Sequence, residues 1–201
     1  MINFNDGILT LIACLAFIMI FLFLFKMHIS NNKALLNKID QITSDKSIKI
    51  KSNYKELTHE DFAEIIIELK KINYYPEIFI EIECGYCKNI SMSIVKGIPK
   101  AIGIETSKKN VKRSREILEK LPKSLKNISV EYQELDNLNL PIIENKTLLL
   151  INNQNYSEEL NNKILEKIGK NIVLILNKIP DNCNMKILKK SNNYFLLNNN
   201  I

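Results

Sequence analysis

Carboxylate and amide side chains follow three short apolar segments of this sequence, and their types suit a nucleoside ligand. Glu81 lies in the segment FIEIECGYC, and Glu105 ends the segment AIGIE. The third segment, LLLI, is followed by amide and aromatic side chains at Asn152, Asn153 and Tyr156. An acidic residue at the end of a second strand is the usual partner of a ribose diol. Together these residues predict a nucleoside-type pocket at one edge of a sheet.

The elements that position these residues alternate along the chain. Strand-like runs are expected at residues 78–82, 101–105, 128–135, 147–151 and 171–176. Helices are expected at 89–96 and 108–121, after the capping-box pair Thr58 and Asp61, and after Ser157. The first helix has an apolar face at Phe62, Ile65, Ile66, Leu69 and Ile72. This order predicts an α/β fold with a doubly wound, mostly parallel sheet, which binds ligands beyond the carboxyl ends of its strands.

The N-terminal region has the composition of a membrane span. Residues 8–25 read ILTLIACLAFIMIFLFLF, without a charge, a proline or a glycine. As a helix they would extend about 27 Å, close to the thickness of the hydrocarbon core. Residues 1–7 carry no lysine or arginine and no A-x-A site follows, which disfavours the alternative of a cleaved signal peptide. We expect a single transmembrane helix at 8–25, preceded by an N-terminal flank at 1–7.

The residues after the apolar run predict its orientation. Lys26, Lys33 and Lys38 follow it, so the positive-inside rule places the C-terminal side in the cytosol. Residues 26–51 read as a polar stalk and linker, 52–190 as the folded domain, and 191–201 as an Asn-rich tail with one short strand. The odd set Cys84, Cys87 and Cys183 is also atypical of a secreted disulfide scaffold.

Four motifs, in their order along the chain, resemble the Dot-one-like (disruptor of telomeric silencing) lysine methyltransferases. They are YKELT (Tyr54–Thr58), FIEIECGYC (Phe79–Cys87), GIE (Gly103–Glu105) and NNQNYSEELNNKI (Asn152–Ile164). The resemblance covers roughly residues 54–180, and the Asn-Asn pair is its most discriminating element. It implies a class I, S-adenosylmethionine-dependent enzyme without a SET domain, methylating protein lysines of the histone type.

The resemblance also implies which residues bind the cofactor. Glu81 would lie near its methionine part, and Gly85 would let the backbone approach it. Glu105 would hold the ribose hydroxyls, and Asp136 would approach the adenine amino group. A covering loop would contain Tyr54, Glu56 and Thr58.

The resemblance assigns methyl transfer to the residues that leave the fourth strand. The catalytic residues would be Asn152, Asn153 and Tyr156, and Asn152 would also contact the cofactor. Transfer to a lysine needs the neutral amine in line with the sulfonium, so the site contributes alignment and a desolvated channel.

The glycine motif departs from the family pattern and keeps two alternatives open. The family sequence D-x-G-x-G-x-G is E-I-E-C-G-Y-C here, with Glu83 and Cys87 at the outer glycine positions. Glu83 would face the cofactor's own carboxylate, so the chain could be a catalytically degenerate methyltransferase-fold binding module. Cys84-Gly85-Tyr86-Cys87 between a strand and a helix is also typical of a thioredoxin-like redox site. No metal site is expected, because the sequence has no second C-x-x-C.

The expected partners follow from these features. They are a membrane crossed once and a protein lysine substrate, with histone as the type example. The formal net charge of +6, from 28 Lys and Arg against 22 Asp and Glu, is also compatible with nucleic acid. The expected location is a membrane, with the C-terminal domain in the cytosol or facing a nucleus or viral factory.

Overall fold

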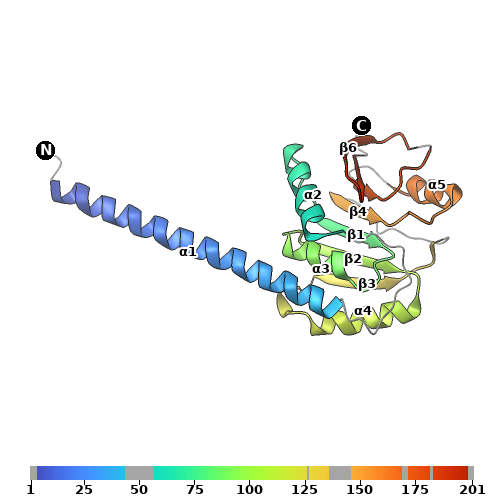
Figure 1. Cartoon of the computed structure of the whole chain (residues 1–201), viewed down its shortest axis with the longest axis horizontal. Helices are drawn as coiled ribbons and strands as arrows, with labels where there is room; N and C mark the ends of the chain where they lie inside the picture. The colour runs from blue at the N-terminus through green and yellow to red at the C-terminus, as the bar shows by residue number, and fades with distance from the viewer. Residues whose placement is uncertain are drawn as a thin grey trace. The chain divides into compact units, whose positions relative to one another are not determined.

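A computed structural model describes residues 4–43, 57–125, 127–135, 146–168, 172–181 and 183–198 (Figure 1). The chain divides into two compact units, Met1–Lys38 and Ile39–Ile201. The predicted site residues Tyr54, Glu56 and Asp136 lie outside the described residues.

Helix α1 (Phe4–Thr43) is one uninterrupted helix of 40 residues (Figure 1). At about 1.5 Å per residue it is about 60 Å long, roughly twice the hydrocarbon thickness of a bilayer. Its large apolar side chains from Ile12 to Ile29 are exposed. Within the described part of the chain, this is the one helix whose length and composition would let it cross a membrane. The helix continues through much of the region predicted as a stalk, and its insertion at residues 8–25 stays a prediction.

The last turn of α1 belongs to the second unit and has partners there. Ile39 is fully buried, and Asp40 Oδ2 lies 2.7 Å from His59 Nε2. The Lys88 ammonium is 3.4 Å from the other Asp40 oxygen. These contacts hold residues 39–43 against the two helices that carry His59 and Lys88.

The second unit contains a seven-stranded sheet in the order β3-β2-β1-β4-β5-β7-β6. Its strands are β1 (Ile78–Ile82), β2 (Lys100–Glu105), β3 (Ile128–Tyr132), β4 (Thr147–Ile151), β5 (Ile172–Leu176), β6 (Lys186–Lys190) and β7 (Phe195–Asn198). Strands β1 to β5 are parallel, and β7 runs antiparallel to both β5 and β6. This strand order, with an antiparallel β7 between β5 and β6, is that of the class I methyltransferase fold, so the predicted fold class is confirmed. The thioredoxin-like alternative is therefore wrong as a fold.

Helices pack on this sheet and connect its strands. They are α2 (His59–Lys71), α3 (Lys88–Val95), α4 (Lys108–Lys120), the 3-10 turn η1 (Lys123–Leu125) and α5 (Glu158–Glu166). Helix α3 contacts β1 and β2, and α4 contacts β2 and β3. Strands β4 and β5 are buried at every position, which explains why their sequences TLLLI and IVLIL do not alternate with polar residues.

Helix α2 confirms the predicted capping box. The Thr58 hydroxyl accepts a hydrogen bond from the Asp61 N–H, and the Asp61 carboxylate accepts one from the Thr58 N–H, both at 3.0 Å. Phe62, Ile65 and Leu69 are buried as expected, and the Phe62 ring packs edge-on against Phe79 at 5.4 Å. The expectation for Ile72 was wrong, because this residue is the C-cap and is 41% exposed.

The C-terminal hairpin differs most from the sequence expectation. Strand β6 (KILKK) was not predicted, because three lysines in five residues mask its pattern. Lysines are common on edge strands, where they prevent pairing with other chains. The predicted tail at 191–201 provides β7, whose Leu196 and Leu197 are fully buried in the sheet. Residues 195–198 of the predicted tail are therefore part of the sheet.

A substitution at Gly103 tests the packing between β2 and the loop after β1. A Cβ at Gly103 would lie 2.5 Å from Cys84 Sγ and 3.1 Å from Ile90 Cδ1. We expect Gly103→Ala to lower the free energy of unfolding by about 1–3 kcal/mol, as overpacking does in other cores. The measurement is urea unfolding of the full chain followed by far-UV circular dichroism. Cys84→Ala in the same chain should recover part of the loss, and no recovery would place the strain elsewhere.

Candidate functional site

The loop from β1 to α3 has an unusual backbone. Glu83, Gly85 and Cys87 have φ values of 60°, 51° and 69°, in the left-handed region. This region costs a residue with a side chain about 1–2 kcal/mol. Among the described residues, Asn73 is the one other non-glycine with a positive φ. The loop therefore keeps a glycine-type conformation at two positions where the side chains oppose it, and strain of this kind clusters at functional sites.

Hydrogen bonds to the end of β2 hold this loop in place. The Cys84 N–H donates to the Ile104 carbonyl at 3.1 Å, and the Gly85 N–H donates to Glu105 Oε2 at 3.0 Å. The Ser114 hydroxyl of α4 donates to the Gly85 carbonyl. A Cβ built on Gly85 would meet no heavy atom within 4 Å, so the backbone faces open space at this point.

Glu105 connects the ends of β1 and β2. It is only 4% exposed, and its other oxygen accepts a hydrogen bond from the Ser107 N–H at 2.9 Å. Ser107 in turn caps α4. A carboxylate offers about four acceptor positions, so Glu105 can accept further hydrogen bonds from a ligand such as a diol. The structure thus brings together Glu105 and Gly85, which the sequence placed at the ends of separate strands.

Two more carboxylates flank the same loop. Glu81 is 3% exposed and accepts a hydrogen bond from Asn89 Nδ2 at 2.7 Å. Glu83 accepts a hydrogen bond from the Tyr156 hydroxyl at 2.8 Å. With Glu105, these groups give the carboxyl ends of β1 and β2 a negative potential, which favours a cationic ligand.

The two cysteines of the loop do not have the environment of a redox site. Cys84 and Cys87 are both buried. A hydrogen bond with Cys87, burial and the negative charges of Glu81 and Glu105 raise the pKa of the Cys84 thiol. A reactive cysteine needs a lowered pKa and access to its partner, so the buried Cys84 lacks both properties.

Tyr156 approaches the loop from the other side of β1. It lies between β4 and α5, is half-buried, and packs against an apolar cluster formed by residues of the sheet and α5. Burial and the neighbouring Glu83 carboxylate raise the pKa of Tyr156 well above its usual range, and Glu105 adds to the effect. The phenol therefore stays protonated and donates to Glu83, which links the carboxyl ends of β1 and β4.

The two asparagines after β4 have different environments. Asn153 is fully buried and donates to Asn161 Oδ1 and the Lys178 carbonyl, at 2.9 and 2.8 Å. Its oxygen accepts from the N–H groups of Asn177 and Lys178, at 3.1 and 3.0 Å. Three of these hydrogen bonds connect the end of β4 with the residues after β5, and the fourth connects it with α5. Asn152 is half-buried and makes none of these contacts.

The remaining predicted residue, Thr58, uses its hydroxyl to cap α2. Several supporting residues were not anticipated from the sequence: Asn89, Ser107, Ser114 and Asn161. Each is a polar residue in or beside a helix. At such positions the sequence pattern does not show whether the side chain makes an internal hydrogen bond or faces solvent. The described residues contain no group of three or more His, Cys, Asp or Glu side chains arranged to hold a metal ion.

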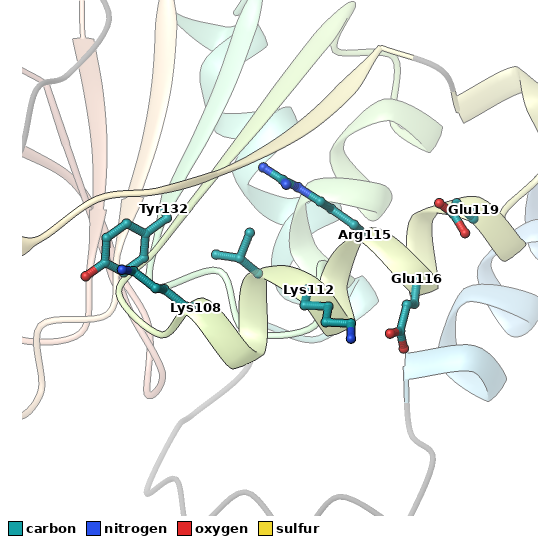
Figure 2. Close-up of a pocket in the computed structure, with 7 residues that line it drawn as sticks. Lys108, Lys112, Arg115, Glu116, Glu119 and Tyr132 are labelled. Carbon is teal, nitrogen blue, oxygen red and sulfur yellow. The ribbon is translucent and has the colours of Figure 1, made fainter.

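A separate open groove runs along α4 and the edge strand β3 (Figure 2). Its lining residues are Lys108, Val111, Lys112, Arg115, Glu116, Glu119 and Tyr132. Figure 2 shows Lys108 beside the Tyr132 ring, with its ammonium 5.1 Å from the ring centroid. Arg115 donates to the Val130 carbonyl at 3.2 Å. Because cations and carboxylates are mixed here, the groove lacks the single-sign charge of a nucleic-acid footprint.

The chain has low similarity to several solved methyltransferase structures. No protein-family model matches it, and no curated protein does. The similar solved structures include the methyltransferase domain of bacterial CtHen1, with 16% identity and a TM-score of 0.48 over 59% of this chain and 64% of that one. Another is CalS10, an amino pentose methyltransferase from Micromonospora echinaspora, with 10% identity and a TM-score of 0.48 over 62% and 52%. A third is coclaurine N-methyltransferase, with 15% identity and a TM-score of 0.44 over 76% and 50%.

The chain thus spans between 50% and 64% of the length of these proteins. The assignment of the fold rests on the strand order of the sheet itself.

The two asparagines offer a matched pair of variants. We expect Asn153→Ala to lower the free energy of unfolding by about 1–3 kcal/mol, because it removes a fully buried side chain and the four hydrogen bonds that it makes. Asn152→Ala should change the free energy by less than about 0.5 kcal/mol. Urea unfolding followed by circular dichroism measures both. Equal losses for the two variants would contradict the structural role assigned to Asn153.

Proposed function

We propose that this chain is an S-adenosylmethionine-dependent N-methyltransferase that acts on a protein amine, with lysine as the first candidate, and that α1 holds it at a membrane. The observation that carries the proposal is the loop at residues 83–87. Within a class I fold, it keeps a left-handed backbone, turns Gly85 toward open space and lies beside the buried Glu105.

The residues of this site fit the cofactor. Its sulfonium supplies an activated methyl group. Gly85 and the adjoining backbone would hold its methionine part, close to Glu81, and Glu105 would accept hydrogen bonds from the ribose hydroxyls. Asp136 stays the proposed partner of the adenine amino group. The buried carboxylates of Glu81 and Glu105 suit a ligand with a positively charged sulfur.

The proposed roles after β4 follow the different environments of the side chains. Asn152 and Tyr156 would face the methyl-transfer site, and Asn153 would position them through its contacts with the loop after β5. Tyr54 and Glu56 stay proposed for the covering loop, with Thr58 at its base. The proposal of a lysine substrate, with histone as its type example, rests on the resemblance to the Dot-one-like motifs.

One observation favours a second candidate, a methyltransferase-fold module that binds without catalysis. The hydrogen bond between Glu83 and Tyr156 joins the ends of β1 and β4, and Glu83 stands at a position where the family has glycine. Such a module would bind S-adenosylmethionine weakly and transfer no methyl group.

Membrane attachment is proposed from α1. A helix that is surrounded by lipid needs no polar face. The segment of α1 from Ile12 to Phe25 has none, and its large apolar side chains are exposed. The lysines that follow favour a cytosolic position for the domain, at the cell's inner membranes or a nuclear or viral-factory membrane.

Two glycines test cofactor binding with matched backbone strain. Gly85 and Gly97 both have a positive φ, and a Cβ on either would meet nothing within 4 Å. We expect the full chain in detergent micelles to bind S-adenosylmethionine in calorimetry. Gly85→Ala should weaken binding by about tenfold or more, because the added methyl enters the space proposed for the cofactor.

Gly97→Ala is the control, because Gly97 lies between α3 and β2, before the amino end of β2. This substitution should change the affinity for S-adenosylmethionine by less than about twofold. No binding by the natural chain, or equal effects of the two substitutions, would refute the proposed site.

Alkaline extraction of membranes tests the anchor. We expect the full chain, synthesised in the presence of microsomes, to stay in the membrane pellet after alkaline extraction. Protease added outside the microsomes should digest its folded domain. Phe17→Lys with Phe21→Lys should release it, since each lysine costs about 2.5–3.5 kcal/mol in the middle of a span.

Ile29→Lys is the control, because Ile29 is exposed and lies beyond residues 8–25. The chain with this substitution should stay in the membrane pellet. A shortened chain protected inside the vesicle would instead indicate a cleaved signal peptide.

A further inference from the structure

Glu83 and Tyr156 form a carboxylate–phenol pair at the carboxyl ends of β1 and β4. The hydroxyl of Tyr156 is 2.8 Å from Glu83 Oε2, and both residues are half-buried. Glu83 is the first residue of the loop at 83–87, whose backbone faces open space at Gly85.

We infer that this pair is the acceptor site for a primary ammonium group, in which Glu83 binds the ammonium and receives its proton. The inference rests on the proposed methyltransferase function and identifies the substrate class as a cationic amine.

The surrounding charges match an ammonium ion. Glu81 and Glu105 are both buried, and the negative charge of each raises the pKa of the Cys84 thiol in the loop. A field that disfavours a thiolate favours a cation in the same place. The Tyr156 hydroxyl occupies one acceptor position of Glu83, and a carboxylate has about four, so the carboxylate can also accept a hydrogen bond from an ammonium. The ring of Tyr156 adds an aromatic face, which attracts cations.

The position of Glu83 is itself informative. Its φ of 60° is one that glycine adopts without strain, and a side chain here costs about 1–2 kcal/mol. A carboxylate in a strained position that also contacts a residue of the methyl-transfer region is consistent with a requirement for its charge.

The chemistry requires a proton acceptor, because an ammonium has no lone pair to attack a methyl group. One N–H proton passes from the ammonium to the Glu83 carboxylate, which leaves a neutral amine and a carboxylic acid. The amine lone pair forms the new N–C bond, while the C–S bond of the bound sulfonium donor breaks and its electron pair stays on sulfur. The acid then returns its proton to water. Tyr156 keeps its own proton throughout, since its raised pKa prevents ionisation at neutral pH.

The test measures amine and cofactor binding separately, by calorimetry on the full chain in detergent micelles. The amine probe is Nα-acetyl-lysine N-methylamide, and Nα-acetyl-norleucine N-methylamide is its uncharged counterpart. We expect the lysine probe to bind and the norleucine probe to bind at least about tenfold more weakly. Glu83→Gln should lose about tenfold in affinity for the lysine probe and change S-adenosylmethionine affinity by less than about threefold. Tyr156→Phe should lose about threefold for the lysine probe, because it keeps the ring and removes one hydrogen bond.

Glu83→Gly tests whether misfolding accounts for a loss of affinity for the lysine probe. It relieves the left-handed strain, so its urea midpoint should rise, yet it should lose affinity for the lysine probe as Glu83→Gln does. A pH–rate profile gives a readout that a structural role would not change. The acid limb of kcat/KM should move to higher pH in Glu83→Gln, because the amine must then lose its proton without a carboxylate partner.

The outcomes separate the inference from the function on which it rests. If Glu83→Gln binds S-adenosylmethionine more tightly and the lysine probe unchanged, the pair is a plug of the cofactor site, and the inference is overturned. If the natural chain binds neither ligand, the proposed function fails as well. If it binds the lysine probe through Glu83 but no cofactor, the amine site stands and the methyltransferase proposal fails.

Discussion

The backbone connection between β1 and β2 is the constraint on which the site depends. The N–H groups of Cys84 and Gly85 are bonded to the end of β2, through the Ile104 carbonyl and the Glu105 carboxylate. These two bonds fix a loop whose neighbouring residues Glu83 and Cys87 would otherwise avoid a left-handed φ. Gly103 makes the approach possible, because it leaves room for the Cys84 side chain. The shape of the loop therefore comes from its neighbours on β2 rather than from its own glycine content.

The same arrangement explains why one short sequence, ECGYC, supports two chemical interpretations. As a C-x-x-C motif it suggests redox chemistry, which requires an accessible thiolate. In the folded chain both sulfurs are buried, and the pKa of Cys84 is raised by Cys87, by burial and by the carboxylates Glu81 and Glu105. The carboxylates that suppress a thiolate also favour a positive charge nearby. One electrostatic environment thus disfavours the redox function and is compatible with the sulfonium and ammonium ligands that we propose.

The segment after β4 contains two kinds of polar residue that lie close together in the sequence. Asn153 turns into the protein and connects β4 with the loop after β5, while Tyr156 turns toward the loop after β1. A motif of neighbouring amides and aromatics can therefore combine a positioning residue with residues of the site. The antiparallel β7 completes this region, because it covers the far side of β5 with Leu196 and Leu197.

The sequence alone determined the α/β class, the bounds of β1 and β4, the capping box of α2 and the apolar helix at the N-terminus. These features depend on local periodicity, on capping side chains and on runs of apolar residues, all of which are local in sequence. Tertiary structure alone decided that β7 lies inside the sheet, that Asn153 is internal, and that Glu83 meets Tyr156 across 73 positions of chain. Those results depend on contacts between distant segments, and a side chain's partners are set by which strands the fold places next to one another.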